Sequence, residues 1–203
     1  MAGNDWLGPR RGEVAAERIL DAAGELFAKH RPASVGMHEI AKAAGCSRAT
    51  LYRYFENRDA LHTAYVHREA YALHHRLLER IADISDSRER LIAGFLTSLE
   101  LVRQSPALKS WFATSDAPIG AEIAEQSDVI KAMGTAFVVS LGPHDDAAAV
   151  DRKGRWLVRV LTSLLIFPGR DAEDERAMVE EFLLPAIEST RTVGFKPPSN
   201  PAP

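Results

Sequence analysis

The chain has 203 residues, 46% of them apolar, which is enough for one large domain or two small ones with a hydrophobic core. Its formal net charge of −3 gives no general preference for nucleic acid, so any such preference must come from a local patch. No apolar run reaches the ~18 residues of a membrane span, and the first residues lack a secretory-signal pattern. The single cysteine, Cys46, excludes an intramolecular disulfide. Together these features predict a cytoplasmic protein that does not enter a membrane.

The first half of the chain is predicted to begin with a flexible arm over residues 1–12. A helix is expected over 13–30, where apolar residues recur at helical spacing. Residues 37–55 then form two short helices around a glycine turn. Asn57 is placed to cap a long helix over about 58–81, and no change in composition interrupts that helix.

The second half reads as further helices separated by proline- and glycine-containing breakers. They are predicted at about 87–103, 107–113, 119–141, 147–167 and 172–192. The last two are strongly apolar, as a two-fold four-helix dimer interface requires. Pro185 should kink the final helix or start its last turn, and the Pro-rich residues 194–203 are expected to be disordered. With no useful stretch of strand-type alternation, the predicted fold class is all-α.

Residues 37–58 carry the most informative pattern. Gly45 is placed to end the first helix with a positive φ, and Ser47 is placed to cap the second. Leu51 and Phe55, four residues apart, should bury one side of the second helix. The side left outward is basic, hydroxylic and aromatic, which is typical of a helix that reads a DNA major groove.

The same segment resembles the DNA-binding domain of TetR-type (TetR/AcrR-like) transcriptional regulators, whose signature is IA..AG.S..TLY.YF.nK..L. The matching positions, within about residues 13–75, are Ile40, Ala41, Ala44, Gly45, Ser47, Thr50, Leu51, Tyr52, Tyr54, Phe55, Asn57, Arg58 and Leu61. Two positions depart from the family pattern. Gly36 stands where the family usually has a capping Thr or Ser, so the first helix should be capped less firmly. Arg58 replaces the usual lysine, which keeps the charge but offers a planar fork.

The helix chemistry and the resemblance together predict the residues that contact DNA. Arg48 is expected to reach base edges, where a bidentate pair with guanine is worth about 1–3 kcal/mol, and Ala49 to touch a thymine methyl. Neighbouring hydroxyl groups suit phosphates, which fix register. The full predicted set is His38, Lys42, Arg48, Ala49, Thr50, Tyr52, Arg53, Tyr54 and Arg58. For His38 and Lys42, a solvated surface role is an equally good interpretation.

For the C-terminal part, the resemblance implies a cavity for a small-molecule effector, walled by large apolar side chains. The predicted ligand-binding residues are His74, Phe95, Leu99, Trp111, Phe112, Met133, Phe137, Trp156 and Arg159. Arg159 is expected to meet an anionic effector or, as the better interpretation, to pair with an acid such as Glu100 or Asp116. His67 and His74 lie seven apart without the usual metal-binding spacing, so no metal or other cofactor is predicted.

The predicted domains are a flexible arm (1–12), a helix-turn-helix DNA-binding domain (13–60), an effector-binding and dimerisation domain (61–193) and a disordered tail (194–203). The function expected is a homodimeric, ligand-responsive transcriptional regulator, most readily a repressor released from a palindromic operator by a small apolar or amphipathic effector. No catalytic constellation is present, so no enzyme activity is predicted. The alternatives are an effector-independent or activating DNA-binding regulator, and an all-α ligand carrier or enzyme.

Overall fold

The computed structural model describes residues 8–112, 119–142 and 146–188. Every element in these ranges is helical, which confirms the predicted all-α fold class. The α-helices are α1 (Gly8–Phe27), α2 (Met37–Ala43), α3 (Arg48–Tyr54), α4 (Arg58–Arg80), α5 (Ser87–Gln104), α6 (Pro106–Lys109), α7 (Ile119–Gln126), α8 (Asp128–Val139), α9 (Ala147–Ile166), α10 (Ala172–Met178) and α11 (Leu184–Glu188). The other helical segments are the 3-10 turns η1 (Pro32–Ser34) and η2 (Ser110–Phe112) and the π-helical turn η3 (Val179–Leu183).

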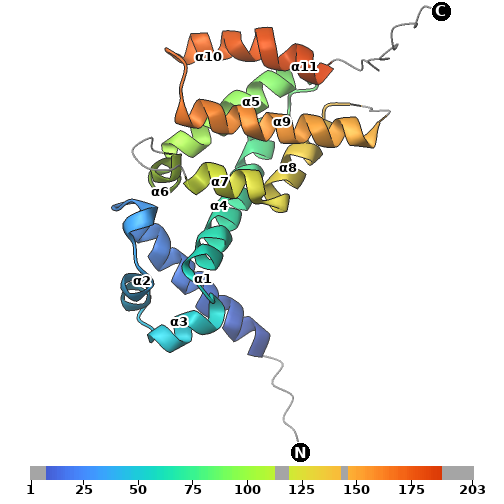
Figure 1. Cartoon of the computed structure of the whole chain (residues 1–203). Helices are drawn as coiled ribbons and strands as arrows, with labels where there is room; N and C mark the ends of the chain where they lie inside the picture. The colour runs from blue at the N-terminus through green and yellow to red at the C-terminus, as the bar shows by residue number, and fades with distance from the viewer. Residues whose placement is uncertain (1–7, 113–118, 143–145, 189–203) are drawn as a thin grey trace, which may run out of the picture.

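The long helix α4 joins the two halves of the molecule (Figure 1). α1, α2 and α3 gather around its N-terminal end, whereas α5, α7 and α8 contact it further along. α9 packs against α8 and α5, and α10 and α11 lie on the outer side of the C-terminal half. α4 runs without a break over almost the whole predicted range. Within the described residues, no helix combines the length and the apolarity that crossing a membrane would need.

Two predicted boundaries are corrected. α1 starts at Gly8, so residues 8–12 of the predicted arm are helical; residues 1–7 and the predicted tail lie outside the described residues. The helix predicted over 119–141 is two helices, because Ser127 caps α8 by accepting from the Ile130 N–H at 3.1 Å. In the final helix the π-helical turn η3 ends at Leu183, and Pro185 then lies at the start of the last turn, α11, as predicted, where its missing N–H costs least.

α8 and α9 cross with their backbones in contact. A Cβ built on Gly154 would lie 2.5 Å from the backbone nitrogen of Thr135, and one on Gly134 would lie 2.7 Å from the Gly154 carbonyl oxygen. Only glycines permit so close an approach. The pair therefore forms a rigid wall beside α4.

Four aromatic rings join the N-terminal helices to the C-terminal half. Phe27 of α1 meets His62 and Tyr65 of α4 edge-on, with ring centroids 5.5 and 5.0 Å apart. Trp111 of η2 completes the cluster at 5.1 Å from Phe27, and each ring is at most 2% exposed. The Ser110 hydroxyl also donates to the Phe27 carbonyl at 3.1 Å. The two halves are thus coupled through a packed core rather than a flexible linker.

Acid is expected to weaken this cluster through His62. Burial, followed by the nearby Arg58 charge, lowers the pKa of His62 to about 4. In the unfolded chain the pKa of histidine is about 6.5. The contribution of neutral His62 to the unfolding free energy is therefore fully present above that pH and is lost as the pH falls from about 6.5 towards 4. The loss attributable to His62 should be about 2 kcal/mol at pH 5. Urea unfolding at pH 7 and pH 5 measures it. In His62→Phe the loss should largely disappear, and an unchanged pH dependence would contradict the assignment.

An ion pair with a buried carboxylate fixes α5 to α9 and α10. Arg103 donates to both carboxylate oxygens of Glu175 at 2.7 Å and to the Leu164 carbonyl at 2.9 Å. Glu175 is 5% exposed and also accepts from the Gly169 N–H at 3.0 Å. These hydrogen bonds, first of all those from Arg103, hold the pKa of Glu175 below its usual range.

Replacing Arg103 with leucine should leave the Glu175 carboxylate buried with most of its charge uncompensated. We expect a loss of about 2–4 kcal/mol of unfolding free energy at pH 7, since the Arg103 side chain is itself 35% exposed. The destabilisation should shrink in acid, because stability held by a carboxylate of lowered pKa is lost as the pH falls through that pKa. Arg152→Leu is the matched control: its pair with Asp146 is exposed on both sides, so the change should stay within about 0.5 kcal/mol.

Candidate functional site

α2 and α3 form a helix-turn-helix whose turn follows the predicted chemistry. Gly45 adopts φ +67°, and its neighbour Cys46 donates its N–H to the Ala41 carbonyl at 3.0 Å. The Ser47 hydroxyl oxygen accepts from the Thr50 N–H at 3.0 Å and so caps α3. The predicted roles of Gly45 and Ser47 are confirmed.

The apolar faces of the two helices pack inward as the spacing predicts. Ile40 and Ala41 of α2 are buried, as are Leu51 of α3 and Phe55 just after it. Gly36 offers α2 no side-chain cap, but the Glu39 carboxylate accepts from the Gly36 N–H at 2.9 Å. α2 is therefore capped from one side only, in line with the weaker cap expected for glycine at this position.

The predicted DNA-contacting residues all lie on the outward side of this unit or at the start of α4. Those classed as exposed are His38, Lys42, Arg48, Ala49, Tyr52, Arg53 and Arg58. Thr50 and Tyr54 are half-buried. Placement alone does not test contact with DNA, so their roles stay predictions.

The aromatic side chains of α3 hold its arginines. The Arg48 guanidinium lies 6.0 Å from the centroid of the Tyr52 ring, one turn along the helix. Arg53 lies 5.2 Å from the Tyr54 ring centroid and donates to the Tyr54 hydroxyl at 3.3 Å. Cation–π contacts of this kind restrict a long side chain while leaving its N–H donors outward.

Arg58 is the residue whose surroundings the sequence did not reveal. Its guanidinium donates to the Ala33 carbonyl at 3.1 Å, tying α4 to the connection before α2. Asn57 caps the same helix by accepting from the Ala60 N–H at 2.8 Å, as predicted. Arg58 therefore braces the N-terminal unit, and its remaining donors are those available for a phosphate.

Among the described residues, the cations on the outward surface of the helix-turn-helix are unpaired, unlike most of those in the C-terminal half. Within the ranges that the structure describes, the cations of α2, of α3 and of the first residue of α4 form no ion pair, whereas Arg68 further along α4 pairs with Glu17 and Asp21. The unpaired cations are Lys42, Arg48, Arg53 and Arg58. By contrast, the arginines of the C-terminal half are mostly paired with acids, among them Arg103, Arg152, Arg155, Arg159, Arg170 and Arg176. Unpaired, exposed cations gathered on one small face suit a polyanion.

A second candidate site is an apolar cavity of about 180 Å³ between α4, α5, α8 and α9. Of the residues predicted to bind a ligand, the ones that line it are His74, Phe95, Phe112, Met133 and Phe137. Whether they touch an effector stays a prediction. Small residues that the sequence pattern did not single out also form the wall: they are Ala70, Gly94, Ala124 and Gly134. In the sequence only large, soft side chains mark a cavity wall, whereas these small residues provide the space rather than fill it.

The remaining four predicted residues lie elsewhere, and their placement in the cavity wall is corrected. Leu99 and Trp111 are buried but face other parts of the core. Trp156 is 49% exposed and, with Arg159, lines a groove on the outer side of α9. α9 lines the cavity with one face and the outer groove with another. Because apolar residues lie on several of its faces, its sequence does not show which of them face inward.

Arg159 is engaged by an acid, as the better of its two interpretations expected. Its guanidinium forms a two-point ion pair with Glu125 of α7, one of whose bonds measures 3.1 Å. The partner is not Glu100, which pairs with Arg80 at 3.4 Å. Asp116, the other suggested acid, lies outside the described residues.

His67 connects α4 to the corner between α7 and α8. Its Nε2 shares a 2.7 Å hydrogen bond with the hydroxyl of Ser127, at the corner between α7 and α8. Burial lowers the pKa of His67, so the ring is neutral at physiological pH. Among the residues that the structure describes, no three His, Cys, Asp or Glu side chains gather as a metal site.

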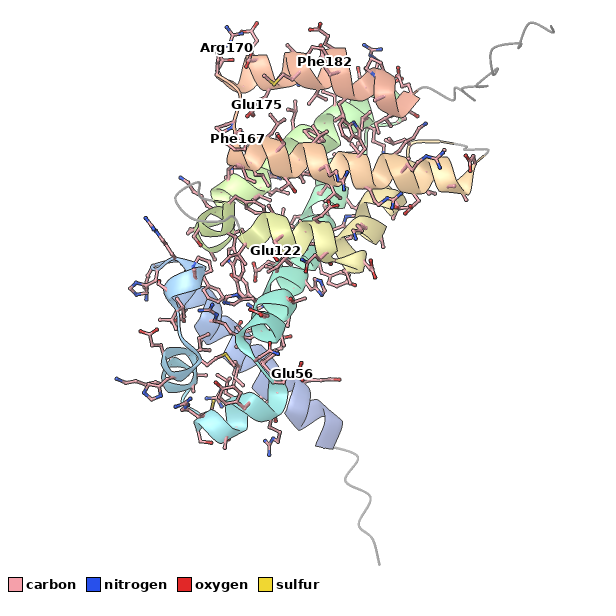
Figure 2. All side chains as sticks on the ribbon, viewed as in Figure 1. Glu56, Glu122, Phe167, Arg170, Glu175 and Phe182 are labelled. Carbon is pink, nitrogen blue, oxygen red and sulfur yellow. The ribbon has the colours of Figure 1, made fainter. Side chains whose placement is uncertain are left out.

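The outer groove of α9 is an exposed apolar surface. It runs between α9 and the α10–η3 segment and is lined by Trp156, Val160, Leu164, Met178, Phe182 and Leu183 among others. Phe182 is 66% exposed, and Phe167 at the end of α9 is 70% exposed. Figure 2 labels both side chains on the outer C-terminal part of the molecule. Large apolar residues left open in one copy of a chain mark an interaction surface.

Comparison with known proteins agrees with this geometry. The sequence profile described as "Bacterial regulatory proteins, tetR family" matches residues 19–65. An uncharacterized HTH-type transcriptional regulator of Mycobacterium tuberculosis is 58% identical over 187 residues, covering 92% of each chain.

Solved structures share the fold at low sequence identity. The repressor QsdR of R. erythropolis has a TM-score of 0.62 at 21% identity and covers 88% of this chain and 97% of its own. FadR of Thermus thermophilus, a TetR-family repressor in complex with lauroyl-CoA, has a TM-score of 0.59 at 22% identity and covers 93% and 98%. The helix-turn-helix, the matched profile and the relative matched over 92% of the chain agree, and the chain belongs to the tetR family of bacterial helix-turn-helix transcriptional regulators.

Proposed function

We propose that this protein is a homodimeric repressor that binds a palindromic operator and releases it when a small apolar or amphipathic effector enters the cavity. The observation that carries the proposal is the course of α4. The helix begins beside α3 at Arg58 and goes on to line the cavity with Val66, Ala70, Leu73 and His74. A change in the cavity therefore acts on the same rigid element that braces the DNA-binding unit.

Residues 13–60 form the proposed DNA-binding domain, and residues 61–193 the effector-binding and dimerisation domain. Arg48 and Ala49, near the N-terminus of α3, would read base edges, while hydroxyl and cationic side chains around them would hold phosphates. The unpaired cations of this face support that assignment. Acting on DNA would place the protein in the cytoplasm.

The dimer would form through the outer surface of α9 and α10–η3. Two copies related by a two-fold axis would bury Phe182 and Trp156 of each chain in a four-helix interface. The same axis would present two α3 helices to half-sites about 34 Å apart or a modest multiple of that distance. Because this self-complementary apolar surface would give a two-fold dimer, the operator would have the same two-fold symmetry.

Switching would require a coupling free energy of roughly 1–3 kcal/mol between cavity and DNA. The aromatic cluster of α1, α4 and η2 offers a packed route for that coupling, because Trp111 contacts both Phe27 and the α4 rings. A ligand that favours one arrangement of α4 would shift the distance between the two α3 helices.

The decisive experiment is a gel shift with footprinting on DNA that flanks the protein's own gene. It is run at two salt concentrations with excess competitor DNA. A protected near-palindrome with a steep loss of affinity at higher salt supports the proposal. Uniform binding that competitor removes contradicts operator recognition at that site. Operator binding that raises transcription in a reporter assay would favour the activating alternative.

A further inference from the structure

The cavity wall contains no charged side chain among the residues that the structure describes. Its residues are apolar or aromatic, with the exceptions of His74, Ser98 and Thr162. A carboxylate or phosphate moved from water into such surroundings loses its hydration and gains no ionic partner. A charged ligand of any shape should therefore bind to this wall more weakly than an uncharged one.

These three polar side chains of the wall can form hydrogen bonds to one uncharged polar group of a ligand. The Ser98 hydroxyl already donates to the Gly94 carbonyl at 2.7 Å, so only its oxygen lone pairs remain. His74 forms no hydrogen bond to another described residue, and burial lowers its pKa, so its ring is neutral at physiological pH. A neutral imidazole and a threonine hydroxyl satisfy one uncharged polar group on a ligand.

Size restricts the occupant further. The cavity measures about 180 Å³. An apolar cavity of about 150 Å³ in another protein stays dry and binds benzene. Closure is tight on one side, because the Phe137 ring lies 2.5 Å from where a Cβ on Gly94 would stand. This volume suits one substituted ring and is too small to enclose a long acyl chain.

We infer that the cavity takes one compact, uncharged, largely hydrocarbon molecule of about the size of a monosubstituted benzene, with at most one hydroxyl or carbonyl group. This inference rests on the proposed function, since it names the class of effector for the same site. It separates this protein from a regulator whose ligand carries a charged headgroup into the pocket.

Direct binding to the full chain without DNA tests the inference. The protein is unfolded, extracted and refolded beforehand, so that no co-purified molecule occupies the cavity. Toluene and benzyl alcohol are the uncharged probes; benzoate is the charged counterpart of similar size, and dodecanoate the long anion. At ten times their Kd, the uncharged probes should raise the Tm by about 3–6 °C. Calorimetry should find benzoate at least about 100-fold weaker than benzyl alcohol.

Two variants on α4 locate the binding. Ala70→Leu fills part of the cavity and should abolish the Tm rise with toluene. Ala72→Leu makes the same change two residues away at an exposed position and should keep it. Circular dichroism and the Tm without probe establish that both variants are folded. If Ala70→Leu proves unfolded, the comparison of benzyl alcohol with benzoate on the unmodified protein decides the matter.

Benzoate or dodecanoate binding as tightly as benzyl alcohol would overturn the inference, as would toluene binding retained in folded Ala70→Leu. Failure of both uncharged probes to bind would overturn it as well. Different results would contradict the proposed function. If toluene binds but no ligand of this class releases operator DNA, the inference about the ligand is supported and the proposed release of DNA by an effector is contradicted. Release of DNA by a charged effector would support the switch and overturn the assignment.

Discussion

Arg48→Ala should lower the affinity for operator DNA by about 10- to 100-fold and flatten the preference for the base that Arg48 reads. The reason is the loss of a bidentate contact worth about 1–3 kcal/mol, made by a side chain that is exposed and stacked on Tyr52 at 6.0 Å. Fluorescence anisotropy on the operator and on its single-base variants measures both effects. Lys109→Ala is the charge-matched control, because Lys109 is an exposed cation on α6.

Tyr52 allows the stacking contribution to be separated from the phosphate contact. Tyr52→Phe keeps the ring under Arg48 and removes the hydroxyl, so affinity should fall to a similar extent on cognate and random DNA. Tyr52→Ala removes both and should also free Arg48, which makes its effect non-additive with Arg48→Ala. Equal losses on cognate and random DNA for Arg48→Ala would contradict the assignment of Arg48 to base recognition.

Phe182→Asp should convert the proposed dimer into monomers and reduce operator affinity by more than about 100-fold. Each half-site then binds alone, without the gain in effective concentration that a linked second half-site provides. Because Phe182 is 66% exposed in the single chain, the substitution leaves the protomer core intact. Sedimentation at several concentrations gives the assembly state, and urea unfolding of the monomer confirms that it is folded.

The matched control for this prediction is Tyr71→Asp. Tyr71 is an exposed aromatic residue, 59% accessible, on α4 and outside the α9–η3 groove. The same acidic substitution there should leave both assembly and operator affinity unchanged. A Phe182→Asp variant that still sediments as a dimer would place the interface elsewhere.

The local features of the DNA-binding unit could be predicted because their causes lie within a few residues. The positive φ of Gly45, the cap by Ser47 and the burial of Leu51 and Phe55 follow from turn chemistry and from helical periodicity. The resemblance to TetR-type regulators rests on these positions. The break at Ser127 escaped prediction because the apolar pattern continues across it and only the cap contact reveals it.

The amino-acid sequence by itself determined the all-helical fold, the helix-turn-helix and the family, since each depends on spacing along the chain. The tertiary structure alone decided which side of α9 faces the cavity, that Arg159 meets Glu125, and that Arg58 braces the Ala33 carbonyl. These pairings join residues far apart in the chain, and helix crossings such as the glycine contact of α8 with α9 select them. The uncharged character of the cavity likewise depends on which side chains those crossings turn inward, a property that periodicity along one helix does not encode.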